Sequence, residues 1–365
     1  MIILYPLFNH LQIKQYNLSI MSILVTGGTG FLGKHLIKEL GYLDEDVHLL
    51  VRKNSNVEEI DNKRLKIFPG DVTNIRTIRE ALKGCKTIFH MASLVKAWVR
   101  NPSEFYRVNV EGLKNVMECA LEEDVTKFIY TSSFMAIGPS NGKINTEETQ
   151  HDPDHLHNHY ERTKYIADQL LPEYLNKGLP VITVYPCVIY GPGEITEGNL
   201  VVRIILDFLG RKIPGILGDG SKLWNYVFVT DVVKGHLLAM EKGKIGEKYI
   251  LGGENISMGN FFKLIEALSG INAPRRHIPF WIAKMSARYD ELIARISGKT
   301  PKHTPSIIEI YKHDWAFSSE KAEQELGYTH ISLKEGLDRT LDWIYKTPGC
   351  KPPFEKGSAD PLWSA

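Results

Sequence analysis

The sequence predicts an α/β fold with a doubly wound parallel sheet, because short apolar runs of strand length alternate with helical segments over the first half of the chain. A glycine-rich turn follows the first apolar run and leads directly into a helix. The expected strands begin with one at Ile23 and continue at 46–51, 65–68, 87–90, 127–130 and 180–185. The expected helices between them cover 34–40, 75–82, 105–122 and 160–175.

The length of 365 residues, with 43% apolar residues, fits about two domains or one large α/β domain with an elaborated end. We expect an N-terminal extension at 1–20, because the first strand starts almost immediately after Met21 and nothing before it has the pattern of a secretory signal. The pattern predicts a dinucleotide-binding domain at 21–190 and a smaller, looser C-terminal substrate-binding region at 191–346 that returns strands to the main sheet. Residues 347–365, rich in Pro, Gly and charge, are expected to be a loose tail.

The formal net charge of +1 gives no indication of a nucleic-acid partner or an acidic membrane surface, so a small molecule is the expected partner. The four cysteines are scattered without metal-ligand spacing, which favours a reducing, cytoplasmic location and no structural zinc. No apolar run is long enough for a transmembrane segment. The expected assembly is a monomer or a homodimer.

Three glycines spaced three apart give the glycine-rich turn its function. Gly27 suits a tight turn, Gly30 allows the backbone to approach a pyrophosphate, and Gly33 allows close packing of helix on strand. The phosphates would lie at the helix N-terminus, where free N–H groups and the helix dipole favour an anion. This pattern predicts a Rossmann-type site, although a turn that is merely tight would look similar.

The end of the second expected strand carries Arg52 and Lys53, where an NAD enzyme usually places an acidic residue. A basic pair suits the 2′-phosphate of NADP better, so NADP is the predicted cofactor and NAD the alternative. A solvated basic pair at a strand end is an equally ordinary explanation.

Tyr160 and Lys164 are four residues apart on an expected helix, so the phenol and the ammonium can face the same cleft. A neighbouring cation would lower the pKa of the phenol and allow Tyr160 to pass a proton. The pair alone could equally belong to an ordinary surface helix. Ser132 and Ser133 follow the fifth expected strand, at an edge where a hydroxyl can bind a substrate carbonyl.

Together, the glycine turn, the serines and the Tyr/Lys pair resemble the extended short-chain dehydrogenase/reductase family over about residues 22–345. The resemblance implies that Tyr160 transfers a proton, that Lys164 lowers the phenol pKa and binds the nicotinamide ribose, and that Ser133, or one register earlier Ser132, orients the carbonyl. Asn109 matches a buried asparagine of the family. The implied cofactor contacts are Gly27, Thr29, Gly30, Phe31, Leu32, Gly33, Arg52, Lys53, Asp71, Val72, Ala92, Ser93, Tyr160, Lys164, Pro186 and Val188.

Two departures narrow the implied activity. Sugar dehydratases of the family carry an acidic pair where this chain has Phe134 and Met135, and nucleotide-sugar epimerases place an arginine where it has Trp224. Segments 130–138, 185–193, 231–236 and 246–255 resemble the dihydroflavonol reductase branch, and within it most closely the plant farnesol dehydrogenases. The resemblance therefore implies an oxidoreductase acting on an alcohol or carbonyl of an apolar substrate, with Phe134 and Trp224 as substrate contacts. A nucleotide-sugar epimerase and a non-catalytic nucleotide-binding scaffold remain alternatives, and Trp224 could instead simply pack in the core.

Two further patterns have ordinary explanations. The histidines at 151, 155, 157 and 159 lie in a loop without a metal-site pattern, and no metal is expected. The segment 280–296 predicts an amphipathic helix, with Trp281, Met285 and Tyr289 on its apolar face. Because its polar face carries both signs of charge, we expect core packing or a pocket lid, with Trp281 as a lid residue, rather than membrane binding.

Overall fold

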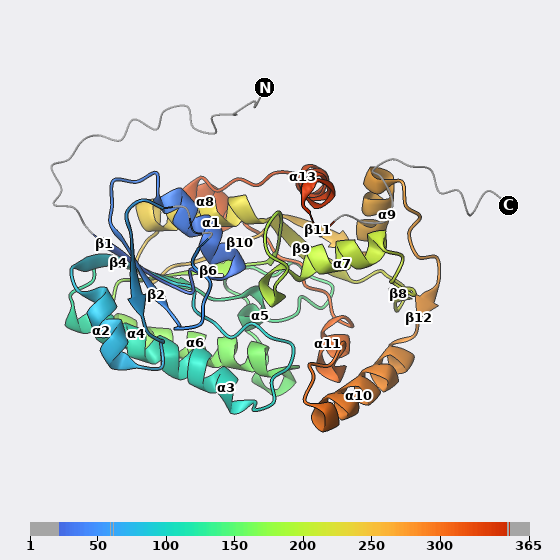
Figure 1. Ribbon diagram of the computed structural model, residues 1–365, viewed down its shortest axis with the longest axis horizontal. Helices are drawn as coiled ribbons and strands as arrows, with labels where there is room; N and C mark the ends of the chain where they lie inside the picture. The colour runs from blue at the N-terminus through green and yellow to red at the C-terminus, as the bar shows by residue number, and fades with distance from the viewer. Residues whose placement is uncertain (1–21, 59, 61, 349, 351–365) are drawn as a thin grey trace.

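The structure is a computed structural model that describes residues 22–58, 60, 62–348 and 350 (Figure 1). The predicted extension at 1–20 lies outside the described residues, and so does most of the predicted tail at 347–365. Helices of the described chain lie on both sides of a central sheet (Figure 1).

Within the described residues, seven strands form one sheet in which every neighbouring pair is parallel. In spatial order the strands are β10 (Lys248–Leu251), β6 (Val181–Pro186), β5 (Lys127–Thr131), β4 (Cys85–His90), β1 (Ser22–Thr26), β2 (Val47–Val51) and β3 (Leu65–Pro69). The chain moves outward from β1 to β3, then crosses to β4 and continues to β6. This doubly wound, Rossmann-type order confirms the predicted fold class.

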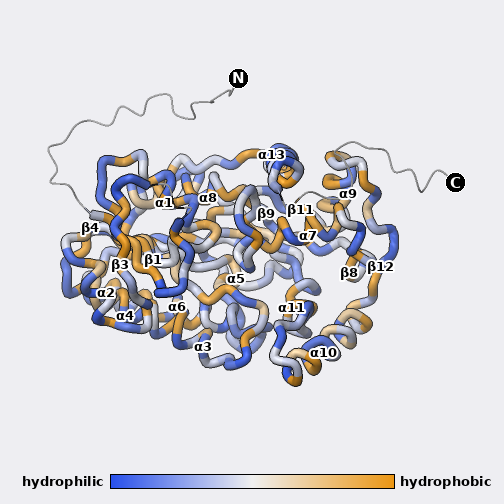
Figure 2. The backbone as a smooth tube through the Cα atoms, viewed as in Figure 1, coloured by the Kyte–Doolittle hydropathy of each residue, from blue (hydrophilic) through white to orange (hydrophobic). Residues whose placement is uncertain are grey.

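Alternate residues of the central strands face two separate cores. On β1, Ile23 and Val25 join one core and Leu24 joins the other, and on β5 Ile129 and Phe128 divide in the same way. These strands are apolar on both faces, as expected for a parallel sheet covered by helices on each side. Figure 2 shows the corresponding hydrophobic band through the central strands.

Helices cover both faces of the sheet. α1 (Phe31–Leu40) and α8 (Val229–Lys242) contribute to the first core, and α2 (Ile75–Leu82), α4 (Gly112–Glu122) and α6 (His159–Asn176) to the second (Figure 1). The short α5 (Phe134–Ile137) follows β5 directly.

The helix expected at 105–122 contains a change of helical pitch that the sequence does not predict. It consists of α3 (Ser103–Tyr106), a π-helical turn at Arg107–Glu111, and α4. Such turns insert one extra residue and are frequent at functional sites. This one carries the buried Asn109.

The C-terminal part of the chain builds one end of the molecule. Its helices are α7 (Leu200–Leu209), α9 (Met258–Ser269), α10 (Phe280–Ser297), α11 (Pro305–Ile310), α12 (Glu320–Leu326) and α13 (Leu333–Lys346). Its short strands form two small sheets. A three-stranded sheet has the order β11 (Glu254–Ser257), β9 (Leu223–Phe228), β7 (Val188–Tyr190). A two-stranded sheet pairs β12 (His277–Ile278) with β8 (Ile216–Leu217). One apolar core runs from β1 to α13, and β10 returns to the main sheet beside β6.

α10 differs from the expectation of core packing. Trp281 is 68% exposed and Ile296 is 81% exposed, and the helix lies at the outer edge of the molecule (Figure 1). Only its opposite side, with Ala287 and Ala294, is buried. The predicted helix is correct. Core packing of its apolar face, one of the two expected roles, is wrong, because nothing in the described chain covers that face. The other expected role, a pocket lid, stays a prediction. No helix in the described part of the chain is both long and apolar enough to cross a membrane.

Candidate active site

The predicted site residues lie along one edge of the central sheet, although they are far apart in the sequence. The glycine turn follows β1, Arg52 follows β2, Asp71 follows β3, Ser93 follows β4 and Ser133 follows β5. All of these strands are parallel, so their carboxyl ends share one edge. The order reverses between β1 and β4, which is the position where doubly wound sheets bind ligands.

The glycine turn has the geometry of a phosphate-binding loop. Gly27 has a φ of +76°, and a methyl group there would lie 2.6 Å from the Ala92 backbone nitrogen. A methyl on Gly33 would lie 2.4 Å from the Gly27 carbonyl oxygen, so helix and turn pack in direct contact. α1 begins at Phe31 without a side-chain cap and with no acidic residue in its first turn. Its N-terminal N–H groups therefore fit the pyrophosphate of a dinucleotide.

Gly28 has a packing role that the spacing of the motif does not reveal. A methyl on this residue would lie 2.4 Å from Ile37 Cδ1 and from Leu49 Cδ1. Gly28 therefore allows α1 to approach β2, a requirement that depends on residues distant in the sequence.

The residues predicted to bind the adenosine end have contrasting environments. Arg52 and Lys53 are exposed at the end of β2, free to meet an anionic group. Asp71 Oδ1 accepts hydrogen bonds from the Thr73 backbone N–H (2.9 Å) and hydroxyl (2.8 Å), so the turn fixes this carboxylate. Val72 is buried.

Tyr160 lies half-buried in the first turn of α6, with the Ser133 and Ser93 side chains near enough to influence its pKa. Burial raises the pKa of Tyr160 to about 12, and the hydrogen bonds with Ser133 and Ser93 oppose this shift. The expected lowering of the pKa of this phenol is therefore not what the structure shows, because desolvation outweighs the stabilising contacts.

Lys164 is buried one turn further along α6. Its Nζ donates to the Thr131 carbonyl oxygen (2.8 Å) and lies 5.1 Å from the centre of the Tyr130 ring. Burial lowers the pKa of Lys164 to about 8, and the charge of Asp168 opposes the shift. Tyr160, Lys164 and Asp168 are spaced four apart and share one face of α6.

Ser132 and Ser133 have different partners. Ser132 Oγ donates to Asp168 Oδ1 (2.6 Å), and the Tyr185 hydroxyl donates to Asp168 Oδ2 (2.7 Å). Ser133 instead caps α5 by accepting from the Met135 N–H, and it lowers the pKa of Tyr160. Burial raises the pKa of Asp168, and its hydrogen bonds with Ser132 and Tyr185 oppose that shift. Asp168 is not among the site residues predicted from the sequence, although its position one turn after Lys164 is a signal that could identify it.

Asn109 joins the loop after β4 to α6. Its Oδ1 accepts from the Leu94 N–H (2.6 Å) and the Ser93 hydroxyl (3.1 Å), and its Nδ2 donates to Thr163 Oγ1 (3.0 Å). The π-helical turn places this amide between the two segments. Asn109 therefore holds Ser93 in register with the helix that carries Tyr160.

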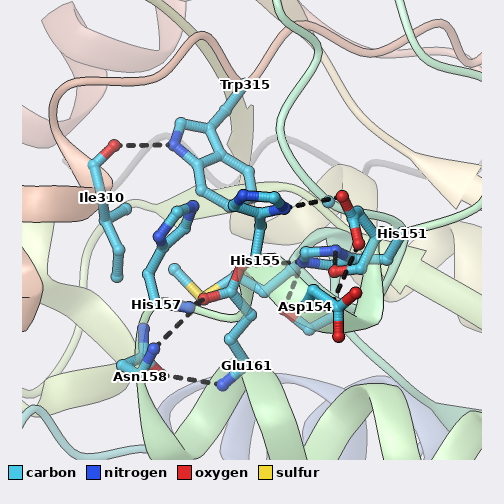
Figure 3. Close-up of polar contacts among 12 residues, drawn as sticks. His151, Asp154, His155, His157, Asn158, Glu161, Ile310 and Trp315 are labelled. Atoms are coloured by element: carbon cyan, nitrogen blue, oxygen red, sulfur yellow. Dashed lines mark hydrogen bonds and ion pairs between the residues drawn. The ribbon is translucent and has the colours of Figure 1, made fainter.

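The histidine run also anchors α6 (Figure 3). His151 Nε2 lies 2.8 Å from Glu161 Oε1, while Glu161 Oε2 accepts from the His157 N–H (2.6 Å). Asn158 and Glu161 form a reciprocal capping box at the start of the helix. Among the described residues, no group of three or more His, Cys, Asp or Glu side chains is placed to hold a metal ion.

A cavity of about 750 Å³ adjoins Tyr160. One wall comes from the loops around Trp98 and Leu156, and the other from α10 and the start of α11. Neither Trp98 nor Leu156 is among the site residues predicted from the sequence, because neither belongs to a recognisable motif. Four cations, Lys96, Arg100, Arg162 and Arg295, also line this cavity.

The two predicted substrate contacts do not line this cavity. Phe134 and Trp224 are buried in an aromatic cluster, with their ring centres 6.5 Å apart. Phe134 also packs edge-on against Trp315 (5.4 Å) and Phe317 (5.6 Å). A direct contact of Phe134 or Trp224 with substrate stays a prediction.

Comparison with known sequences agrees with this geometry. The profile described as the NAD dependent epimerase/dehydratase family matches residues 23–252. The chain belongs to this family. Members of this extended short-chain dehydrogenase/reductase family are NAD-dependent dehydrogenases, epimerases and dehydratases, so the predicted family is confirmed.

Similar curated members of the epimerase/dehydratase family include a Synechocystis protein provisionally named dihydroflavonol 4-reductase, 31% identical over 88% of this chain and 93% of that protein. Sterol demethylase protein B of Methylococcus capsulatus is 30% identical over 89% of this chain and 98% of that protein. The mouse sterol-4-alpha-carboxylate 3-dehydrogenase, decarboxylating, is 30% identical over 87% of this chain and 89% of that protein. The similarity to the dihydroflavonol reductase branch is thus confirmed, while that to plant farnesol dehydrogenases stays a prediction.

Solved structures of the same fold include the protein gox2253, with a TM-score of 0.76 and 35% identity over 89% of this chain and 98% of that chain. The UDP-glucose 4-epimerase of Thermotoga maritima, solved with UDP-glucose, has a TM-score of 0.70 and 25% identity over 89% of this chain and 99% of that chain.

Proposed function

We propose that this protein is a nicotinamide-dependent oxidoreductase that interconverts an alcohol and a carbonyl on a largely apolar substrate. The observation that carries the proposal is the position of Tyr160, which lines a cavity of about 750 Å³ and lies near enough to Ser133 and Ser93 for both to influence its pKa. Lys164 lies one turn further along the same helix. This arrangement unites a proton donor and a hydroxyl that can hold a substrate oxygen.

Each residue has a distinct proposed role. Tyr160 gives a proton to the substrate oxygen during reduction and removes it during oxidation, while Ser133 donates a hydrogen bond to the same oxygen. Lys164 stabilises the phenolate when Tyr160 loses its proton. A nicotinamide cofactor in the site supplies or accepts the hydride.

We propose NADP as the cofactor and NAD as the alternative. The glycine turn and the uncapped start of α1 fit the pyrophosphate of either one. The exposed Arg52 and Lys53 favour the 2′-phosphate of NADP, because no acidic side chain takes the position that holds a free ribose hydroxyl. Asp71, Val72, Ala92, Pro186 and Val188 lie at the same sheet edge or just beyond it and are proposed contacts of the cofactor.

The proposed substrate class is a sterol, flavonoid or prenyl alcohol or ketone. The names of the relatives support polycyclic apolar substrates, and Trp98, Phe105 and Leu156 offer apolar surface in the cavity. The cations at its rim suit a carboxylate on such a substrate, as in the name of the mouse relative. We further propose a cytoplasmic location, which the scattered, unpaired cysteines support.

A nucleotide-sugar epimerase is the second candidate, favoured by the similarity to the Thermotoga maritima enzyme. Against it, β9 carries the buried Trp224 where epimerases place an anion-binding arginine.

The deciding experiment measures nicotinamide absorbance with NADP or NAD and a panel of sterols with and without a 4-carboxylate, flavonoids, prenyl alcohols and UDP-sugars. We expect turnover on a member of the apolar set, and we expect Tyr160→Phe to lower kcat by about 10²–10⁴ while the affinity for cofactor stays the same. Interconversion of UDP-sugars with bound NAD, followed by chromatography of the sugars because it causes no net change in nicotinamide absorbance, would establish the epimerase instead. Cofactor binding without turnover on any substrate would indicate the scaffold.

A further inference from the structure

α10 carries an uninterrupted apolar face that the rest of the described chain leaves uncovered. Its exposed large apolar side chains are between 43% and 81% accessible and comprise Trp281, Ile282, Met285, Tyr289, Leu292, Ile293 and Ile296. With 3.6 residues per turn, these positions fall on one side of the helix. Elsewhere in the described chain, exposed large apolar residues are scattered singly or nearly so.

The opposite side of α10 fixes the helix to the protein. Ala287 and Ala294 are buried, and Lys284 Nζ pairs with Glu309 Oε2 on α11 (2.8 Å). The orientation of the helix is therefore set by packing, and its apolar side chains are held exposed. The helix itself lies at the edge of the molecule (Figure 1).

The segment around α10 is strongly basic, although the whole chain is nearly neutral. Residues 275–303 contain seven Lys and Arg and two Asp and Glu, which gives a local net charge of +5 in a chain of net charge +1. Arg275 and Arg276 are exposed before the helix, and Lys299 and Lys302 are exposed after it.

Both acidic residues of the segment lie away from the apolar face. Asp290 and Glu291 are half-buried, and Glu291 pairs with Arg295 (2.8 Å) and lines the cavity. In the sequence, the presence of both signs of charge on the polar face argued against membrane binding. In the structure, the acidic side chains lie away from the exposed apolar face. The exposed surface combines apolar side chains with basic ones.

We propose that the outer face of α10 binds the surface of a lipid bilayer that contains anionic lipids. An amphipathic helix of this kind lies in the plane of the interface, with its apolar side chains among the acyl chains and its cations at the headgroups. Trp281 and Tyr289 suit this boundary, because their rings are apolar and their tips are polar. A second copy of the chain is a poorer occupant, since two such helices packed face to face would bring like-charged basic ends together.

The inner side of the same helix lines the cavity beside Tyr160. Bilayer binding would therefore place the cavity close to a reservoir of apolar molecules. This consequence rests on the proposed function, whereas binding of the bilayer itself does not.

The test is flotation of the full chain with vesicles of phosphatidylcholine, with and without phosphatidylserine, at low and high salt. We expect binding that requires phosphatidylserine, weakens with salt and shifts part of the tryptophan fluorescence, that of the exposed Trp281, to shorter wavelength. Leu292→Ser with Ile296→Ser should abolish binding, and each of Arg288→Glu and Lys299→Glu should lower partitioning at least about fivefold. The matched control is Tyr42→Ser with Ile245→Ser, two exposed apolar residues outside α10 that should leave binding unchanged.

Circular dichroism and thermal melting should show that all of these variants are folded. The proposal is overturned if wild-type protein does not float with the anionic vesicles, if the control variant loses as much binding as the α10 variant, or if the α10 variant instead converts a stable dimer into a monomer without any change in lipid binding. None of these readouts depends on turnover, so a failure of the proposed oxidoreductase function would not be mistaken for a failure of the proposed bilayer binding.

Discussion

His151 Nε2 lies 2.8 Å from Glu161 Oε1, and both side chains are buried below the first turn of α6. Glu161 is the residue after Tyr160 and also accepts from the backbone at the start of the helix. The loop that precedes α6 is thus tied to the helix at the point where the proposed proton donor projects.

We expect His151→Phe to lower the free energy of unfolding by about 1–3 kcal/mol, because it leaves a buried carboxylate oxygen without a partner. The variant should also lower kcat more than it changes cofactor affinity, since Tyr160 would lose its fixed position. Urea unfolding and steady-state kinetics measure the two effects. His155→Ala is the control, because His155 and its partner Asp152 are both exposed, and unchanged stability in His151→Phe would contradict the anchoring role.

Adjacent serines provide a matched pair of substitutions. Ser133→Ala should lower kcat roughly 10- to 1,000-fold by removing a hydrogen bond to the substrate oxygen. Ser132→Ala should leave kcat largely intact and lower stability by about 1–3 kcal/mol, because Asp168 loses a buried partner. Kinetics and urea unfolding of both variants check this. The reverse pattern would assign the substrate contact to Ser132.

Arg52 is the residue on which the cofactor preference is expected to depend. A charge-assisted contact with a 2′-phosphate contributes about 1.5–3 kcal/mol, so Arg52→Asp should shift the ratio of kcat/KM for NADP over NAD by about tenfold or more. Lys83→Asp, at the exposed C-terminal end of α2, should leave the ratio unchanged. A wild-type enzyme that already prefers NAD would refute the assignment.

His90 should make stability depend on pH. Burial, with a smaller effect of the Lys164 charge, lowers the pKa of His90 from 6.5 to about 3 in the folded protein. Between these two values the unfolded chain binds a proton that the folded protein does not, so stability falls as the pH falls, by about 1.4 kcal/mol per unit. His90→Asn should be less stable near neutral pH, since it disturbs the contact with Thr26, but its stability should decline less steeply towards acid. Urea unfolding at several pH values measures the two slopes, and parallel slopes would argue against this origin.

The sequence was sufficient to predict the parts of the site that depend on local rules. Strand ends, a glycine turn and a Tyr/Lys pair on one helix face are all encoded by short spacings, and the structure places them at one sheet edge. Because the strands of the sheet are parallel, their carboxyl ends share one edge, and this brings the glycine turn and Ser133 together.

The contacts that the sequence did not predict depend on residues distant along the chain. Asn109 reaches Ser93 and Thr163 only because a π-helical turn interrupts its helix, and no local pattern predicts that turn. The direction of the Tyr160 pKa shift was wrong because burial, which depends on the whole fold, outweighs the neighbouring groups. For α10 the periodicity correctly predicted an apolar face, but periodicity does not say what covers a face.

The two walls of the cavity come from segments that are far apart in the sequence. The residues proposed to move protons all precede residue 190, whereas α10 and α11, which close the far side, follow residue 279. Selection can therefore act on the two walls separately, and replacements in the later helices can retune which molecules are admitted without disturbing the reacting groups. Sequence divergence in these helices would let enzymes that share one reaction accept substrates with unrelated carbon skeletons.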